Sequence, residues 1–148
     1  MADFYISVKG VHAEKCPAWK KYGEYDVGAE GYKIYYKDGY VSWCPKEEFE
    51  RQYLHLDCED KITQNDVDTF IDTVKDFKIG DKTTVVQATC KNGFVLTDSS
   101  SCVDKENFDM NVGKLCCMYH IADKVWFLLG FLLQSAKTGF NHNMKEGR

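Results

Sequence analysis

The sequence predicts an α+β fold. A small antiparallel sheet with hairpins packs on a long C-terminal helix, and a small β-hairpin and helix module precedes it. Two tight-turn signals, Asp38-Gly39 and Asn92-Gly93, lie between runs rich in aromatic and β-branched residues, and such dipeptides favour β-hairpins. An apolar helical pattern from Met110 to about Ser135 predicts the long helix.

Residues 1–57 are expected to form the N-terminal module. Pro45 suits the first turn of a helix that runs to Tyr53, and Glu47 and Glu48 face the positive end of its dipole. The predicted strands that precede this helix are residues 4–8, 32–36 and 40–43. The polar stretch from Asp57 to Lys61 follows a completed unit and is the expected boundary.

A second α+β domain is expected over residues 61–136. Thr63 is a candidate N-cap with Asp66 as its capping-box partner. The helix predicted after it rests on an apolar stripe at Val67, Phe70, Ile71, Val74 and Phe77. Strands are then expected at residues 83–89, 94–97 and 100–103. One apolar face of the long helix is expected at Leu115, Tyr119, Ala122, Trp126, Leu129 and Leu133. Residues 137–148 are expected to be a flexible tail.

The composition limits the classes of function. With 44% hydrophobic and 14% aromatic residues, the chain of 148 residues can build a core. A net charge of -4 argues against a general nucleic-acid binder. The longest apolar run, Val125 to Leu133, is short of the roughly 20 residues that span a bilayer. No secretory signal opens the chain, so a soluble intracellular protein without membrane contact is expected.

Nothing in the motifs predicts catalysis, a cofactor or a metal site. The chain has no Gly-x-Ser-x-Gly, phosphate loop or His-Glu-x-x-His. The cysteines follow no Cys-x-x-Cys or zinc-finger spacing, and their odd number suits no ordinary disulfide framework. Reduced, mostly buried thiols are therefore expected at positions 16, 44, 58, 90, 102, 116 and 117.

An ordered set of motifs in the second half resembles a widespread family of small bacteriophage accessory proteins. The set comprises Asn92-Gly93-Phe94, Ser100-Ser101-Cys102-Val103, Asn107-Phe108-Asp109 and Lys124 to Leu133 with its Val-Trp-x-Leu-x-Gly pattern. In the first half, Glu30 to Lys33, Asp38 to Trp43 and Pro45 to Phe49 look like a small module fused to phage proteins that neutralise Thoeris immunity.

The second half is also similar to the first described type of Thoeris anti-defence protein. That resemblance implies a small α+β homo-oligomer in the host cytoplasm that sequesters glyco-cyclic ADP-ribose or a cyclic oligonucleotide without chemistry. The chain departs from the pattern at Leu129, where the family often has Glu. Its cations before the end of the long helix are lysines, whereas arginines would be the better bidentate phosphate ligands. The identity of the ligand therefore stays open.

Such a sponge needs aromatic faces for a base, cations or helix N-termini for phosphates, and amides for ribose. Phe94 follows the hairpin turn and could stack on a base or begin the strand core. Asn107 could read a base edge or cap a helix. Lys114 lies near the positive end of the long helix, and His120 and Lys124 share one face four residues apart. Lys114 could meet an anion or simply be a solvated lysine. His120 and Lys124 could together grip a phosphate or form part of an oligomer contact, and a lone helix histidine often serves only structure.

The first half has an unusual density of aromatic residues. On alternating strand faces some of them must be exposed, which indicates an interface or second site at Tyr36, Tyr40 and Trp43. Cross-strand aromatic pairing explains the same density equally well. The alternative function is therefore a protein-binding module that inhibits a host defence factor through this aromatic half.

Overall fold

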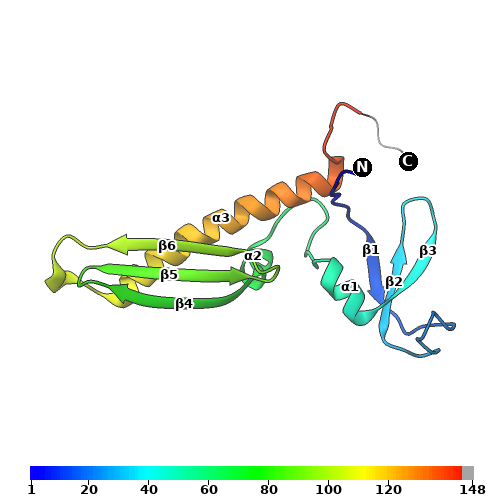
Figure 1. Cartoon of the computed structure of the whole chain (residues 1–148), viewed down its shortest axis with the longest axis horizontal. Helices are drawn as coiled ribbons and strands as arrows, with labels where there is room; N and C mark the ends of the chain where they lie inside the picture. The colour runs from blue at the N-terminus through cyan, green and yellow to red at the C-terminus, as the bar shows by residue number, and fades with distance from the viewer. Residues whose placement is uncertain (145–148) are drawn as a thin grey trace. The chain divides into compact units, whose positions relative to one another are not determined.

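The computed structural model describes residues 1–144 and is the predicted α+β fold (Figure 1). The chain divides into two compact units. The first comprises residues 1–55 and the described residues from Gln134 onward, and the second is Leu56–Leu133. Each unit holds one antiparallel sheet of three strands. Of the expected C-terminal tail, Lys137 and Thr138 belong to the last helix, and residues 145–148 lie outside the described residues.

The sheet of the first unit has the order β1-β2-β3, with β1 at His12–Lys15, β2 at Gly31–Tyr35 and β3 at Val41–Pro45. The predicted hairpin between β2 and β3 is confirmed, and Gly39 has the positive φ of 91° that its turn requires. Trp43 is 5% exposed, and its indole N–H donates to the Cys16 carbonyl at 2.8 Å. Its ring lies so close to Gly31 that any side chain there would collide with it.

Helix α1 runs over Lys46–Gln52, with Pro45 at its N-cap. It is held to β2 by a column of stacked rings. Phe49 stacks on Tyr32 with 4.2 Å between ring centroids and on Tyr53 with 4.6 Å. The predicted helix is therefore confirmed, and its aromatic residues serve to attach it to the sheet.

The strand predicted at residues 4–8 is wrong. These residues form no regular strand, and Phe4 and Tyr5 are almost fully exposed. The strand that pairs with β2 is instead β1, in which His12 lies opposite Tyr35 and Lys15 opposite Tyr32. A high strand propensity yields a strand only where a partner edge is available, and here the polar His12–Lys15 occupies that edge.

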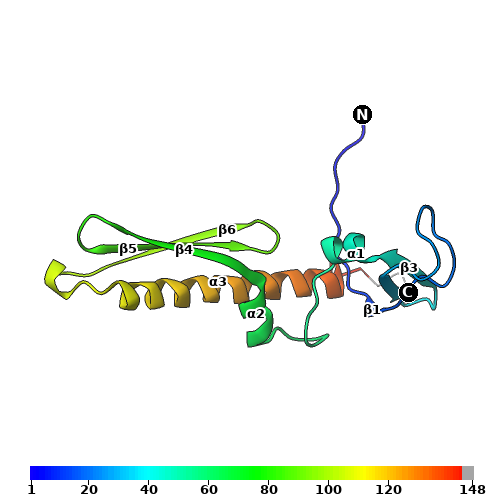
Figure 2. The ribbon, with the colours of Figure 1, turned by 90° about the horizontal axis from the view of Figure 1, so that it is seen from below.

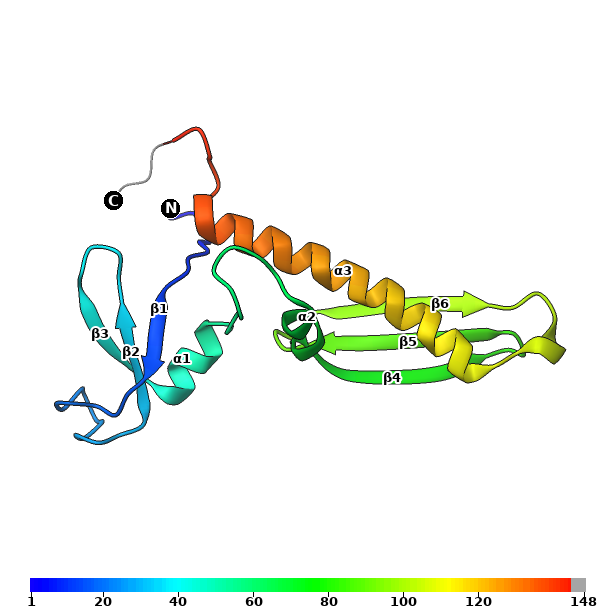
Figure 3. The ribbon, with the colours of Figure 1, turned by 180° about the vertical axis from the view of Figure 1, so that it is seen from behind.

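In the second unit, α2 (Gln64–Phe70) leads into a three-stranded sheet of β4 (Ile71–Ile79), β5 (Thr83–Cys90) and β6 (Val95–Ser101). A 3-10 turn at Lys105–Asn107 connects β6 to α3, which spans Met110–Thr138. Figure 2 shows sheet and helix as two layers, and Figure 3 shows α3 running obliquely across one face of the sheet. The predicted hairpin β5–β6 is confirmed, and Gly93 has a φ of 87°.

The helix predicted through Phe77 ends at Phe70, so its second half is wrong. The Thr63 capping box is present as predicted, and Asp66 is buried beneath it. From Ile71 the chain is strand β4, which pairs with β5 and changes register between Ile71 and Thr73. Apolar residues at 71, 74 and 77 fit a helical period. In the strand the irregularity brings Ile71 and Val74 to the same half-buried face, whereas Phe77 lies on the other face and is 47% exposed. The short third strand predicted at 100–103 is the end of β6.

The face of α3 that packs on the sheet also differs from the prediction. The buried row consists of Gly113, Cys117, Ile121, Val125 and Leu129, spaced by four residues. Leu115 and Tyr119, which were expected on the apolar inner face, are each 71% exposed. The helix is apolar on both sides, so its periodicity alone does not identify the side that meets the sheet.

Helix α3 makes its closest approach to the sheet at Gly113. A Cβ atom there would collide with Thr84 Oγ1. One turn later, the Cys117 thiol lies 3.9 Å from the Thr84 carbonyl oxygen. Small residues on the first two turns thus bring the helix axis close to β5, and the larger Ile121, Val125 and Leu129 fill the space farther along.

By length and apolar composition alone, α3 could cross a membrane. In the structure, 22% of its most apolar stretch of 18 residues is buried. The nine-residue apolar run in the sequence does not reveal this, because isolated polar residues interrupt the rest of the helix. Core helices of soluble proteins share the same length and composition.

Gly113→Ala should lower the free energy of unfolding by about 1–3 kcal/mol, because the added methyl group overpacks the contact with Thr84. Gly130→Ala is the matched control, since its methyl group would meet nothing within 4 Å apart from its chain neighbours and the backbone of its own helix. The control should leave stability unchanged or raise it by up to about 1 kcal/mol through helix propensity. Urea denaturation followed by circular dichroism measures both, and equal effects would contradict the packing.

Candidate functional site

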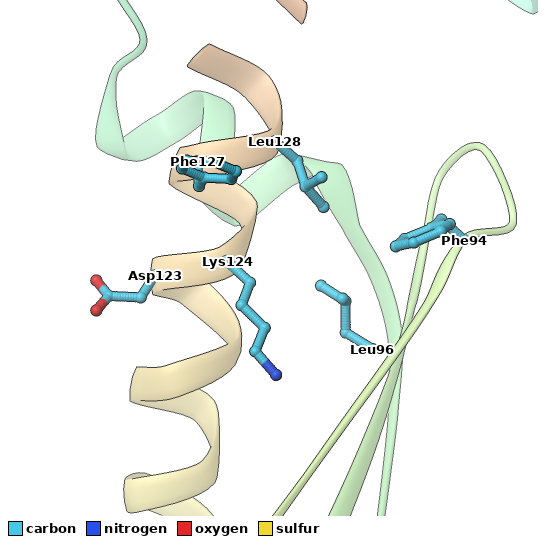
Figure 4. Close-up of a pocket in the computed structure, with 6 residues that line it drawn as sticks. All are labelled: Phe94, Leu96, Asp123, Lys124, Phe127 and Leu128. Carbon is cyan, nitrogen blue, oxygen red and sulfur yellow. The ribbon is translucent and has the colours of Figure 1, made fainter. Parts of the chain in front are cut away.

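An open pocket of about 320 Å³ lies between the start of β6 and the middle of α3. Figure 4 shows Lys124 and Leu128 directed toward the strands, whereas the Asp123 carboxylate points to the other side of the helix. We call this the Phe94 pocket. Its lining residues are Phe94, Leu96, Asp123, Lys124, Phe127 and Leu128.

Phe94 is placed by the turn that precedes it. Gly93 has a positive φ, and the Asn92 side chain accepts the Phe94 backbone N–H at 3.1 Å. The Phe94 carbonyl accepts from the Cys90 N–H at 2.8 Å, which closes the hairpin. The backbone of Phe94 is therefore fixed while its side chain is 53% exposed. A fixed backbone with an exposed aromatic ring is suited to stacking on a planar ligand.

Lys124 supplies the positive charge of the pocket. It is exposed and forms no ion pair with another residue in the described part of the chain. Leu96 and Leu128 provide an apolar surface beside it. An ammonium group that is not already neutralised by a carboxylate is available to a phosphate, so the pocket combines an aromatic ring, an apolar floor and one free cation.

His120 lies one helical turn before Lys124 and is engaged with β6. Its Nδ1 lies 2.8 Å from Asp98 Oδ2. Because a carboxylate only accepts, Nδ1 carries the proton and Nε2 remains for a ligand. Asp98 also brings negative charge close to the pocket and opposes an anion at His120. His120 is thus held in place by Asp98, with its remaining nitrogen available.

Asn107 and Lys114 lie elsewhere in the second unit. Asn107 lines a separate pocket of about 190 Å³ near the start of α3, together with Ser100 and Ser101. Lys114 pairs with Asp76 on β4, with 3.5 Å between Nζ and Oδ1. Of the five ligand-binding residues predicted from the sequence, only Phe94 and Lys124 therefore line the Phe94 pocket. His120 lies one helical turn outside its lining, and Asn107 and Lys114 lie elsewhere.

The first turn of α3 is already capped by a carboxylate. Asp109 Oδ1 accepts the backbone N–H groups of Asn111 at 2.9 Å and Val112 at 3.3 Å. The amides that would attract an anion at a helix N-terminus are satisfied by this cap. The N-terminal anion site envisaged around Lys114 is therefore opposed by Asp109 and by the ion pair with Asp76.

The aromatic residues predicted as an interface in the first unit have different environments. Tyr36 and Tyr40 stack with 5.8 Å between centroids, and Lys9 lies over the Tyr36 ring at 5.7 Å. Tyr40 is exposed. Trp43, in contrast, is a core residue that stacks on Tyr22. Only the two tyrosines present surface to a partner.

Sequence reasoning missed Leu96, Asp98 and Leu128. Leu96 and Asp98 alternate along β6 and face α3, and Leu128 follows Lys124 by one turn. Side chains of a strand alternate between its two faces, so Leu96 and Asp98 could have been assigned to the face toward α3 if the strand had been predicted to reach Ser101. Among residues 1–144, no group of three or more His, Cys, Asp or Glu side chains could hold a metal ion.

All seven cysteines are free thiols, and they differ in exposure. Burial raises the pKa of Cys90, and burial together with the nearby Asp98 raises the pKa of Cys117. Cys116, adjacent to Cys117 in sequence, is exposed to solvent. A raised pKa leaves less of the reactive thiolate at neutral pH.

Comparison with known proteins identifies one family. A family model described as phage protein (N4 Gp49/phage Sf6 gene 66) matches residues 62–137, a little over half of the 148 residues. The match takes in α2, the second sheet and almost all of α3. No curated protein and no solved structure matches the chain.

Alkylation with iodoacetamide at pH 7.5 should modify Cys116 at least tenfold faster than Cys90 or Cys117, because the two buried thiols combine low access with a raised pKa. Mass spectrometry of a time course reports each site separately. The three rates should converge in denaturant, which serves as the control. Equal rates in the native protein would contradict the described packing of α3 on β5.

Proposed function

The chain belongs to the phage protein (N4 Gp49/phage Sf6 gene 66) family, and we propose that this phage accessory protein binds and sequesters a cyclic nucleotide-derived immune signal in the host cytoplasm. The proposed ligands are glyco-cyclic ADP-ribose and cyclic oligonucleotides. Binding is reversible and stoichiometric, and the ligand leaves chemically unchanged.

The observation that carries the proposal is the pairing of Phe94 with Lys124 across one pocket. The ring offers a stacking face for a base, and the ammonium group offers a counter-charge for a phosphate. The Nε2 atom of His120 adds a polar group one turn away. These are the groups that a nucleotide requires, and no nucleophile is needed for binding.

The size of the pocket supports action as a homo-oligomer. Ligand pockets usually enclose about 300–1,000 Å³, so 320 Å³ in an open pocket is at the lower end. A cyclic nucleotide would extend beyond it into solvent. We therefore place the ligand at a subunit boundary, where a second copy supplies additional wall. Asn107 and Lys114, which lie away from the pocket in one copy, can contact the ligand only from such a second copy.

Phe94→Ala and Lys124→Gln should each weaken binding of the signal at least tenfold, because each removes one of the two recognition groups. Isothermal titration with glyco-cyclic ADP-ribose and with cyclic oligonucleotides measures the affinity. Phe77→Ala and Lys75→Gln are matched controls, since both residues are exposed on β4 away from the pocket. The controls should bind as the unchanged protein does.

Two results would overturn the proposal. The first is the absence of binding heat with every one of these nucleotides. The second is recovery of cleaved nucleotide after the complex is denatured, which would make the protein an enzyme. Intact ligand, released in a fixed molar ratio, is the expected result.

The alternative function is inhibition of a host defence factor by direct binding through the first unit. The stacked pair of the half-buried Tyr36 and the exposed Tyr40, with Lys9 beside it, favours this alternative. Trp43 has no part in the contact because it is buried.

If the alternative holds, Tyr36→Ala with Tyr40→Ala should abolish capture of one specific host protein, and Lys124→Gln should not. Tyr5→Ala is the control, because Tyr5 is an exposed tyrosine outside the stacked pair. Affinity purification from infected cells with quantitative mass spectrometry compares the variants. Loss of the same host protein with Lys124→Gln would instead attribute capture to the second unit.

A further inference from the structure

The Phe94 ring, the Lys124 ammonium group and the His120 imidazole lie in a row between β6 and α3. Phe94 and Lys124 line the Phe94 pocket together with Leu128. In Figure 4, Phe94 and Leu128 lie toward one end of the pocket and the Lys124 ammonium group lies toward the other. A further contact between the same strand and helix joins Asp98 to His120. The row therefore runs from an aromatic ring past a cation to an imidazole.

The spacing of the row follows from the geometry of its two elements. His120 precedes Lys124 by four residues, which is about 6 Å along a helix. Asp98 follows Phe94 by four residues, which is about 13 Å along a strand. This distance exceeds the length of a purine ring system, so a base that stacks on Phe94 does not reach His120. A ligand group at His120 therefore belongs to another part of the molecule.

His120 offers a hydrogen-bond acceptor to a ligand. Its Nδ1 atom lies 2.8 Å from Asp98 Oδ2 and donates to it, so the proton of the neutral ring is on Nδ1. Nε2 then has a lone pair without a proton and accepts from O–H or N–H groups. The His120 side chain is 56% exposed, and its Nε2 has no hydrogen bond to another residue within the described range 1–144.

The neighbours of His120 fix the position of this acceptor. Asp98 is held on β6 opposite the buried Val86 of β5, and its side chain is only 21% exposed. It lies beside the Cys117 thiol, whose pKa is raised by burial and then by the charge of Asp98. The Tyr119 ring meets the imidazole edge to face, with 6.1 Å between centroids. The direction and the tautomer of His120 are therefore set before a ligand binds.

We propose that His120 recognises a ribose hydroxyl of the nucleotide and that Asp98 is the positioning residue that keeps Nε2 an acceptor. This inference rests on the proposed function and goes further, because it specifies the sugar of the ligand. When a base stacks on Phe94 and a phosphate meets Lys124, the group that follows along the row is the sugar on the far side of the phosphate. The free 2′-hydroxyl of a 3′,5′-linked ribonucleotide donates to Nε2, and 2′-deoxyribose lacks it.

A phosphate contact is the competing role of His120. Its surroundings oppose that role, because the Nε2 lone pair and the nearby Asp98 carboxylate both repel a phosphate oxygen. Lys124, which forms no ion pair in the described part of the chain, already supplies the counter-charge. His120→Lys has opposite effects in the two roles. An ammonium group cannot accept from a hydroxyl, whereas it strengthens a phosphate contact.

Isothermal titration at pH 8, at which imidazole side chains are normally neutral, compares cyclic di-AMP with its 2′-deoxyribose counterpart. The unchanged protein should bind the ribose form roughly three- to tenfold more tightly, which is the effect of one neutral hydrogen bond. His120→Ala should bind both forms with equal affinity. His55→Ala is the matched control, because His55 is an exposed histidine of the first unit, and it should keep the preference for ribose.

His120→Lys should lose the preference for ribose while it binds the 2′-deoxyribose form at least as tightly as the unchanged protein does. Two results overturn the proposal. One is equal affinity of the unchanged protein for both forms. The other is a loss of affinity in His120→Ala that is the same for both forms, which would assign His120 to the phosphate.

The tautomer of His120 is measured without nucleotide, by long-range ¹H–¹⁵N spectra of the full chain at pH 8. The His120 signals, identified by their absence from His120→Ala, should show the proton on Nδ1. Asp98→Ala should move the proton toward Nε2, because an unrestrained imidazole in water favours that tautomer. A proton on Nε2 in the unchanged protein, or on both nitrogens, overturns the proposal even if Asp98→Ala does not fold.

The outcome for the proposed function is separate. If neither form gives binding heat, cyclic dinucleotides are not the ligand and the proposed function is overturned for this class. Binding of both forms with equal affinity overturns the recognition of ribose alone.

Discussion

The packing of α3 on β5 is the contact on which the second unit depends. Gly113 and Cys117 allow the helix to approach Thr84, and Ile121, Val125 and Leu129 continue the same row over the rest of the sheet. Because the row repeats every four residues, it fixes the rotation of the helix about its axis. That rotation directs Lys124 toward the Phe94 pocket and leaves Tyr119 and Phe127 on the outside.

The turns and helix caps could be predicted from the sequence because they depend on neighbouring residues. The structure has the predicted turns at Gly39 and Gly93 and the predicted capping box at Thr63. The strand at residues 4–8 and the helical extension through Phe77 could not be predicted, because both depend on distant partners. Strand β4 exists because β5 pairs with it along its whole length, and tertiary pairing overrides a helical spacing of apolar residues.

The candidate site shows the same division. Phe94 and Lys124 were identified from local features, a hairpin turn and a helix position, and they line one pocket. The engagement of His120 by Asp98 and of Lys114 by Asp76 joins elements far apart in the sequence. Such pairings decide which charged side chains remain available to a ligand. They cannot be predicted from a single sequence, because they depend on how distant elements pack. The inner face of α3 was mistaken because both sides of the helix are apolar.

The order of the elements along the chain has a consequence for synthesis. Strands β4, β5 and β6 are consecutive and joined by short turns, so this meander has the local contacts that favour rapid folding. Its covering layer, α3, follows all three strands in the chain and therefore leaves the ribosome after them. Until α3 has emerged, Val86, Ala88 and Cys90 stay uncovered, and during that interval the nascent chain is exposed to aggregation and to chaperones.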